Sequence, residues 1–130
     1  MEESQNSLTI ITKQGDVGIV NFTTTQVLDE VNVQQLGREL MELVDKHYLV
    51  KIVINFEKVK FLSSAVLGKL ISLSKRISAE KGRLAFCHIR PEILQVFQIT
   101  RLDKLIPILD KEDEAVRQVQ KGGGWFGRAK

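Results

Sequence analysis

The apolar residues at the start of the chain fall into two short runs, residues 8–12 (LTIIT) and 17–22 (VGIVNF). Both runs are rich in β-branched residues, and a short connection that includes Gly15 separates them. Such a glycine-containing connection between two runs predicts a β-hairpin. The next apolar residues recur at spacings of three and four positions: Val33, Leu36, Leu40 and Leu43. This change of period predicts an amphipathic helix over residues 32–46.

The middle of the chain predicts a buried strand followed by a second helix. Residues 49–56 (LVKIVINF) are apolar except for Lys51 and Asn55, which is typical of a central strand covered on both faces. Residues 61–64 (FLSS) then lead into the helix. Its apolar positions share one face: Val66, Leu67, Leu70, Leu73 and Ile77. Gly82 follows as the predicted helix stop.

The last third of the chain predicts two more strands and two more helices. Residues 84–87 (LAFC) predict a buried strand, and Pro91 suits the first turn of a helix over residues 92–100. Residues 105–109 predict a last strand. Pro107 places that strand at an edge of the sheet, because proline has no N–H for a ladder on both sides. A final helix is expected over residues 112–120.

The order of these elements predicts an α/β fold. Strands that alternate with helices of this length form right-handed βαβ units. We therefore expect a single domain with a mixed, mostly parallel sheet of about five strands and about four helices. The 130 residues fit one domain: an N-terminal extension over 1–7, the domain over 8–120, and a flexible, Gly-rich basic tail over 121–130.

The tail also carries two aromatic residues, Trp125 and Phe126, directly after the glycines at 122–124. One interpretation is a disordered chain end. The other is a short element in which Trp125 anchors a partner or a sister subunit, as aromatic residues often do. The sequence leaves both interpretations open.

The net charge of +3 comes from the tail. Lys121, Arg128 and Lys130 lie there without an acidic residue, and the preceding 120 residues hold 16 basic and 16 acidic side chains. A nucleic-acid-binding protein would carry a basic stripe on its folded surface, so no nucleic acid is expected as a partner. No apolar run is long enough to cross a bilayer, and the acidic, polar N-terminus differs from a signal peptide. With one cysteine, a cytoplasmic location is expected.

The side chains that could carry catalysis are few. His47 follows a predicted helix and His88 follows a predicted strand, where a dipole partner and a loop residue are the simpler interpretations. Cys87 ends an apolar strand, where a buried thiol is the ordinary case. No cluster has metal-ligand spacing, and no phosphate-binding glycine motif is present. We therefore expect a binding protein with no catalytic residue, no metal site and no cofactor.

The turn at Ser63 and Ser64, between the central strand and the second helix, has two interpretations. In the first, a serine hydroxyl caps the helix by accepting a bond from a free N–H, a contribution of about 1 kcal/mol. In the second, the free N–H groups and the positive end of the helix dipole make the same position tolerant of an anion. A phosphate on a serine there would change what the surface binds while leaving the domain folded.

At these residues the chain resembles the STAS domain, the fold of bacterial anti-sigma factor antagonists. The resemblance spans roughly residues 8–119 and rests on VINF at 53–56 followed by FLSSAVLG at 61–68. In the family, a buried strand leads into an Asp-Ser-Ser/Thr-Gly turn and then the start of a Leu-Gly helix. Leu28 and Asp29 match a Leu-Asp pair that members of the family often carry near the phosphorylation site.

The resemblance implies which residues act and on what. The family's phosphoacceptor falls on Ser64, with Ser63 as the second choice. The implied partner-binding surface surrounds it: Leu28, Asp29, Leu62, Ser63, Ala65, Val66 and Lys69. The implied partner is an anti-sigma factor that is also a serine kinase of the histidine-kinase-like ATPase class, so the ATP belongs to the partner. Phosphorylation would abolish binding, and a PP2C-type phosphatase would restore it.

Two residues depart from the family pattern: Leu62 stands where the family has Asp, and Ala65 stands where it has Gly. Leu62 removes a charge beside the serine, which favours a second hypothesis. In that hypothesis the chain is a STAS scaffold, or a subunit of a larger regulatory or transport complex, with no phosphorylation cycle. The sequence also leaves open whether two copies form a homodimer.

Overall fold

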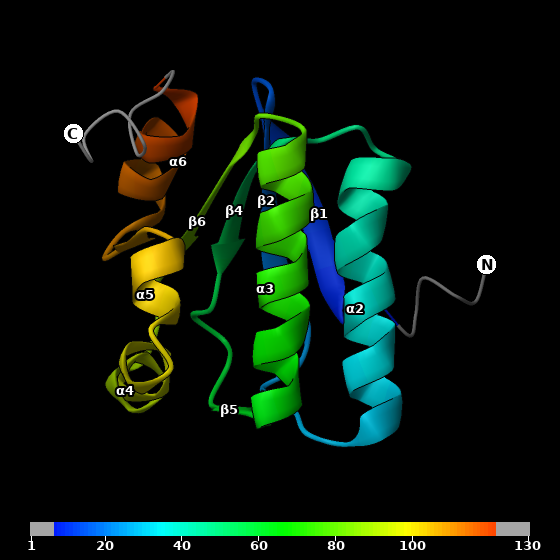
Figure 1. The fold of residues 1–130 in the computed structure, drawn as a ribbon, viewed down its shortest axis with the longest axis vertical. Coiled ribbons are helices and arrows are strands. Elements are labelled where there is room, and N and C mark those ends of the chain that lie inside the picture. The colour runs from blue at the N-terminus through cyan, green and yellow to red at the C-terminus, as the bar shows by residue number, and fades with distance from the viewer. Residues whose placement is uncertain (1–6, 122–130) are drawn as a thin grey trace.

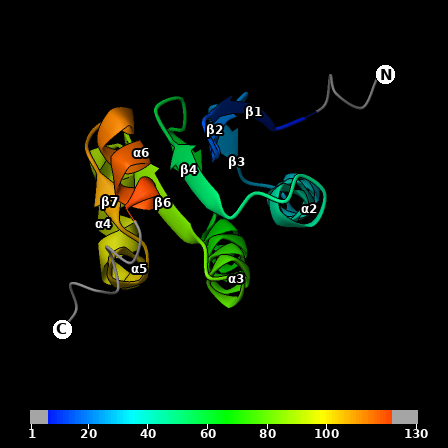
Figure 2. The same cartoon turned by 90° about the horizontal axis from the view of Figure 1, so that it is seen from above.

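The computed structural model describes residues 7–121, which form one sheet between two unequal layers of helices (Figures 1 and 2). The sheet has five strands in the order β1-β2-β4-β6-β7. Their bounds are Thr9–Gln14 for β1, Val17–Phe22 for β2, Lys51–Asn55 for β4, Arg83–Cys87 for β6 and Ile108–Leu109 for β7. β1 pairs with β2 antiparallel, and the other neighbours are parallel. The predicted hairpin and the mixed, mostly parallel sheet are confirmed.

In the described part of the chain, five helices flank the sheet where about four were expected. They are α2 (Glu30–Asp45), α3 (Ser64–Ala79), α4 (Pro91–Ile99), α5 (Leu102–Leu105) and α6 (Glu112–Gln120). α2 and α3 lie side by side against one face (Figure 1). α6 contacts β2, β4 and β6 from the opposite face.

The alternation of side chains along the central strands divides the core in two. Phe22, Ile52 and Ile54 point toward α2 and α3 and belong to the larger cluster. Small side chains such as Ala85 and Cys87 point the other way, under α6. Because β4 lies between β2 and β6 and its residues from Ile52 to Asn55 are buried, the prediction of a central strand covered on both faces is confirmed.

Four phenylalanines hold the larger core together at the carboxyl end of the sheet. Phe56 lies at the centre, with its ring 5.0 Å from that of Phe86, 5.3 Å from Phe22 and 5.9 Å from Phe97, centroid to centroid. Such aromatic contacts are worth about 0.5–1.5 kcal/mol each beyond the burial of their area. Phe97 belongs to α4, so this cluster attaches α4 to the sheet.

The predicted last strand over residues 105–109 is wrong in its first half. Residues Leu102–Leu105 form the short helix α5, and only Ile108–Leu109 pair in β7. The change occurs at Ile106, which is extended with φ −128° and ψ 127°, because a residue before proline avoids helical dihedrals. The edge position predicted from Pro107 is confirmed, since β7 ends the strand order.

A second small sheet was not predicted. Gln26–Val27 (β3) and Phe61–Leu62 (β5) pair in parallel, with Gln26 opposite Phe61 and Val27 opposite Leu62. Two-residue strands leave no alternating pattern in a sequence, so only the fold brings them together. This pair fixes the loops before α2 and before α3 to one another.

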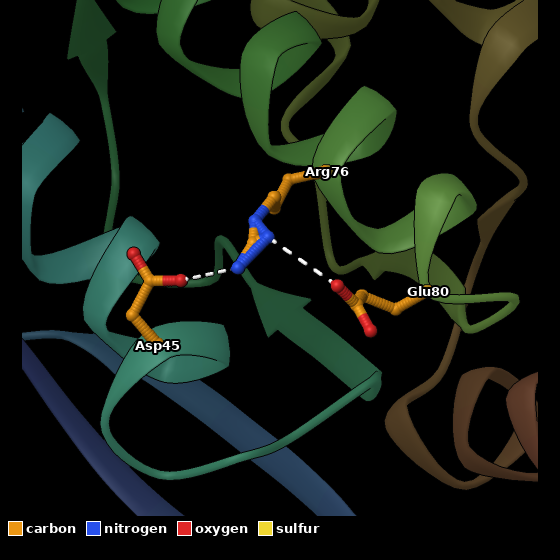
Figure 3. A network of polar contacts seen from close by, with 3 residues as sticks. All are labelled: Asp45, Arg76 and Glu80. Carbon is orange, nitrogen blue, oxygen red and sulfur yellow. Dashed lines mark hydrogen bonds and ion pairs between the residues drawn. The ribbon is translucent and has the colours of Figure 1, made fainter.

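At the other end of α2 and α3, an ionic contact joins the two helices (Figure 3). Arg76 Nη2 of α3 lies 2.5 Å from Asp45 Oδ1 of α2, and Arg76 Nη1 lies 3.5 Å from Glu80 Oε2. Arg76 is 37% exposed, and such surface pairs contribute little to stability, about 0–1 kcal/mol. The Asp45 pair links the C-terminal ends of the two helices, whereas the Glu80 pair lies within the end of α3.

The end of α3 differs in detail from the predicted stop at Gly82. The residue with left-handed dihedrals is Lys81, with φ 62°. The N–H of Lys81 donates to Ser78 O and that of Gly82 to Ile77 O, which together make a Schellman motif. Gly82 is required for another reason, because a Cβ there would lie 2.1 Å from Val50 O. It allows the chain to pass directly against the residue before β4.

We therefore predict that Gly82→Ala lowers the free energy of unfolding by about 1–3 kcal/mol, since the backbone of Val50 must shift. Gly68→Ala is the matched control. Gly68 lies inside α3 with open space where its Cβ would be, so alanine there should raise stability by about 0.5–1 kcal/mol. Urea denaturation followed by circular dichroism measures both. Equal effects at the two positions would contradict the role given to Gly82.

Candidate functional site

The candidate site is built on the β3–β5 pair at the carboxyl end of the sheet. The N–H of Ser63 donates to Val27 O at 3.0 Å, and the N–H of Lys60 donates to Thr25 O at 2.7 Å. These bonds connect the loop that begins α2 with the loop that begins α3. Leu28 and Asp29 therefore lie next to Ser63 and Ser64, although more than thirty residues separate the two pairs in the sequence.

Ser63 occupies the N-cap position of α3 without capping it. Its dihedrals are extended, φ −79° and ψ 160°, as an N-cap requires, but its side chain makes no cap hydrogen bond. Its Oγ is buried and has no hydrogen-bond partner among the described residues. The interpretation of this turn as a serine-capped helix is therefore wrong for Ser63.

Ser64 is the first residue of α3, and its side chain is exposed. The first N–H groups of a helix have no intrahelical acceptor, and the side chain at the N-cap position, Ser63, makes no cap hydrogen bond. The first turn of α3 contains no acidic residue. An anion attached to Ser64 would therefore meet free donors and the positive end of the helix dipole.

Asp29 has the capping role at the neighbouring helix. Its Oδ1 accepts a hydrogen bond from the N–H of Asn32 at 2.8 Å and so caps α2. The helix begins at Glu30, two residues before the predicted start; the available signal was Asp29 itself, because aspartate is a preferred N-cap residue. Leu28, just before this cap, is 47% exposed.

The remaining predicted site residues divide between surface and core. Ala65 is exposed, and Lys69 is half-buried with its Nζ 3.3 Å from Gln34 Oε1 of α2. Leu62 is half-buried and packs against the larger core. Val66 is 0% exposed, so its side chain supports the turn from inside and presents no surface to a partner.

Two exposed apolar residues of the site were missed from the sequence. Val31, in the first turn of α2, is 72% exposed, and Phe61, the first residue of β5, is 58% exposed. Together with Leu28 they form what we call the apolar rim (Leu28, Val31 and Phe61) at the same end of the molecule as Ser64. The signal was available for Val31, which falls outside the helical period of Val33, Leu36 and Leu40.

The other side chains that could carry chemistry are Cys87, His88 and His47. Burial, followed by the charges of Glu112 and Glu57, raises the pKa of Cys87 to about 12, so this thiol stays protonated. His88 lines a shallow hollow with Glu57, Arg90 and Asp110. Within residues 7–121, no group of three or more His, Cys, Asp or Glu side chains is arranged to hold a metal ion. His47 is exposed just after α2.

Comparison with known proteins gives the family. The family model of the STAS domain matches residues 10–115 of the chain. The chain belongs to the STAS domain family. No helix within the described part of this STAS domain is long and apolar enough to cross a membrane.

Relatives and solved structures agree with this assignment. The STAS domain is 22% identical over 103 residues to the anti-sigma F factor antagonist of Paenibacillus polymyxa, covering 79% of this chain and 88% of that one. A STAS domain protein of Planctomyces limnophilus matches with a TM-score of 0.77 at 22% identity, covering 87% and 98%. The Bacillus protein SpoIIAA matches in its unphosphorylated form (TM-score 0.67, 18% identity, 86% and 97% covered). Its phosphorylated form matches with a TM-score of 0.66 at 19% identity, covering 85% of this chain and 98% of that one.

For this STAS domain we predict that Asp29→Ala lowers the free energy of unfolding by about 1 kcal/mol, because the N-cap acceptor of α2 is lost. Asp29→Asn keeps an acceptor oxygen and should change the free energy of unfolding by only about 0.2–0.4 kcal/mol. Urea denaturation measures the difference. Should Asn destabilise as much as Ala, the charge and not the hydrogen bond would be what holds the helix start.

Proposed function

We propose that the chain is a regulatory binding protein of the anti-sigma factor antagonist type, which docks an anti-sigma factor and releases it when Ser64 is phosphorylated. The observation that carries this proposal is the exposed hydroxyl of Ser64 at the uncapped start of α3, at the end of the molecule that also presents the apolar rim. The proposed partner is a serine kinase of the histidine-kinase-like ATPase class. A PP2C-type phosphatase would reverse the modification.

The apolar rim supplies the docking energy in this proposal. Large apolar side chains exposed together on a small domain mark interaction sites, and aromatic residues such as Phe61 are frequent anchors. Lys58 and Lys60, both exposed, flank Phe61 and add a basic border. The docking surface then consists of the apolar rim, Asp29, Ser63, Ser64, Ala65 and Lys69.

The switch follows from the position of Ser64 on this surface. A phosphoryl group adds about −1.5 to −2 charges at pH 7. The start of α3 can accommodate that charge in the free protein, so the domain stays folded. In the complex the same charge would be desolvated against a surface that fits a neutral hydroxyl, which weakens binding. SpoIIAA, which shares this fold, is described in both phosphorylation states.

The two departures from the family pattern are compatible with this role. Leu62 packs against the core as part of β5, so an apolar residue has a structural place there. Ala65 lies in the first turn of α3, where alanine favours the helix more than glycine does. Neither side chain covers Ser64, which remains exposed.

The second candidate function is a STAS scaffold without a phosphorylation cycle, which the apolar Leu62 beside the serine favours. The two candidate functions differ in whether the protein is phosphorylated. Intact-mass analysis of the protein purified from its native cells should show a fraction that is heavier by one phosphoryl group, with the modified peptide containing Ser64. A single unmodified mass under all growth conditions would favour the scaffold.

We predict that Ser64→Asp weakens binding to the captured anti-sigma factor at least about 30-fold, because the carboxylate is buried without a partner in the complex. Ser64→Ala should bind as tightly as the wild type and should not be phosphorylated. Titration calorimetry with the purified partner measures both affinities.

Ser78→Asp is the matched control for this pair of variants. Ser78 is exposed on the same helix but lies about 21 Å further along it, at 1.5 Å per residue. It should leave the affinity unchanged. If Ser64→Asp bound the partner like the wild type, the switch at this residue would be refuted.

We also predict that Phe61→Ser weakens partner binding at least about 10-fold through loss of an anchor, with little change in stability. Tyr48→Ser is the matched aromatic control. Tyr48 is 82% exposed and follows the opposite end of α2, outside the proposed surface. Equal losses of affinity in the two variants would place the docking surface elsewhere.

A further inference from the structure

A narrow slot lies at the end of the domain opposite Ser64. Its walls come from the last turns of α3, the start of β6, the segment between α5 and β7, and the end of α6. The lining is mainly apolar: Ile77, Leu84, Leu105, Ile106, Pro107 and Val119. The empty space between the walls is about 360 Å³, part of it open to solvent. Leu105, on the slot, is 43% exposed.

The C-terminal segment starts directly beside this slot. Gln118 and Val119 line it and belong to the last turn of α6, which ends at Gln120. Lys121 leaves the helix in an extended conformation, φ −70° and ψ 120°. The residues that follow are GGGWFGRAK at 122–130, with the chain's sole tryptophan at position 125.

The connection from Lys121 to Trp125 is short enough to keep the tryptophan close to the slot. Four residues from Lys121 to Trp125 span at most about 14 Å. The glycines at 122–124 allow the chain to turn in any direction at no steric cost. A side chain held this close to a surface reaches an effective concentration of the order of millimolar.

We propose that Trp125 folds back onto its own domain and packs across the mouth of the slot, against Leu105 and Pro107. Because the walls approach closely, the indole ring covers the opening and leaves one face in water, as tryptophan is seldom fully buried. Arg83, half-buried in the lining, is available to the exposed face of the ring as a cation. The occupant of the slot is therefore the chain's own tail and not a partner.

This contact is independent of the proposed partner site. The α3 residues of the slot, which run from Ser74 to Ser78, lie about 15–21 Å along the helix from Ser64, at 1.5 Å per residue. The tail and an anti-sigma factor can be bound at the same time. Failure of one proposal leaves the other unaffected.

The fluorescence of Trp125 in the full chain tests the proposal. We expect an emission maximum at shorter wavelength than in the urea-unfolded chain and an acrylamide quenching constant about two- to threefold lower, since one ring face is shielded. Leu105→Glu should move both values to those of the unfolded chain, because a charge now borders the slot. Circular dichroism verifies that this variant is folded.

Ile99→Glu is the matched control. Ile99 is 80% exposed on α4 and does not line the slot, so the emission should stay that of the wild type. The proposal is overturned if the wild-type emission already equals that of the unfolded chain, or if Leu105→Glu leaves a shifted emission unchanged. A blue shift that disappears on dilution would also overturn it, because the occupant would then be the tail of a second copy.

Discussion

The backbone hydrogen bonds between β3 and β5 are the constraint on which the candidate site depends. Each strand has only two residues, Gln26–Val27 and Phe61–Leu62, and neither would form alone. Together, with Ser63 N–H bound to Val27 O, they lock the starts of two parallel helices side by side. The positive ends of α2 and α3 therefore face the same way, one capped by Asp29 and the other left open at Ser64.

The two helix ends have different environments because their capping differs. At α2 the carboxylate of Asp29 and the neighbouring Glu30 compensate the dipole. At α3 the N-cap hydroxyl of Ser63 is buried and has no hydrogen-bond partner within residues 7–121, and the first turn is free of acidic residues. The uncompensated positive end of a helix dipole is therefore at the start of α3. The apolar rim comes from the start of α2, the residue before its N-cap and β5. A surface of this kind suits the docking of a protein whose binding responds to one added charge.

Much of the fold could be predicted from the sequence because its long elements have clear periods. The buried run of β4 and the apolar stripes of α2 and α3 lie within a few residues of where the pattern places them. The short elements could not be predicted. β3 and β5 depend on pairing across the fold, and α5 has only four residues, too few to show a helical period.

The candidate site was predictable in part. Ser64 and the Leu28-Asp29 pair were found through the family pattern, and the helical period of residues 66–77 already placed Val66 on the apolar face, whereas the exposure of Phe61 depends on how β5 enters α3. Val66, two residues after Ser64, already belongs to the interior.

Gly82 approaches the Val50 carbonyl at the end of the sheet where β4 and β6 begin, opposite the end that carries Ser64. The residue with left-handed dihedrals, Lys81, lies at the same end as Gly82. At that end of the sheet the backbone segments are in close contact and leave little room for a side chain. At the end that carries Ser64, positions 28, 31, 60 and 61 are exposed, so their side chains are not restricted in this way. Replacement of the side chains at these positions is therefore expected to change the outer surface of the domain without disturbing its packing.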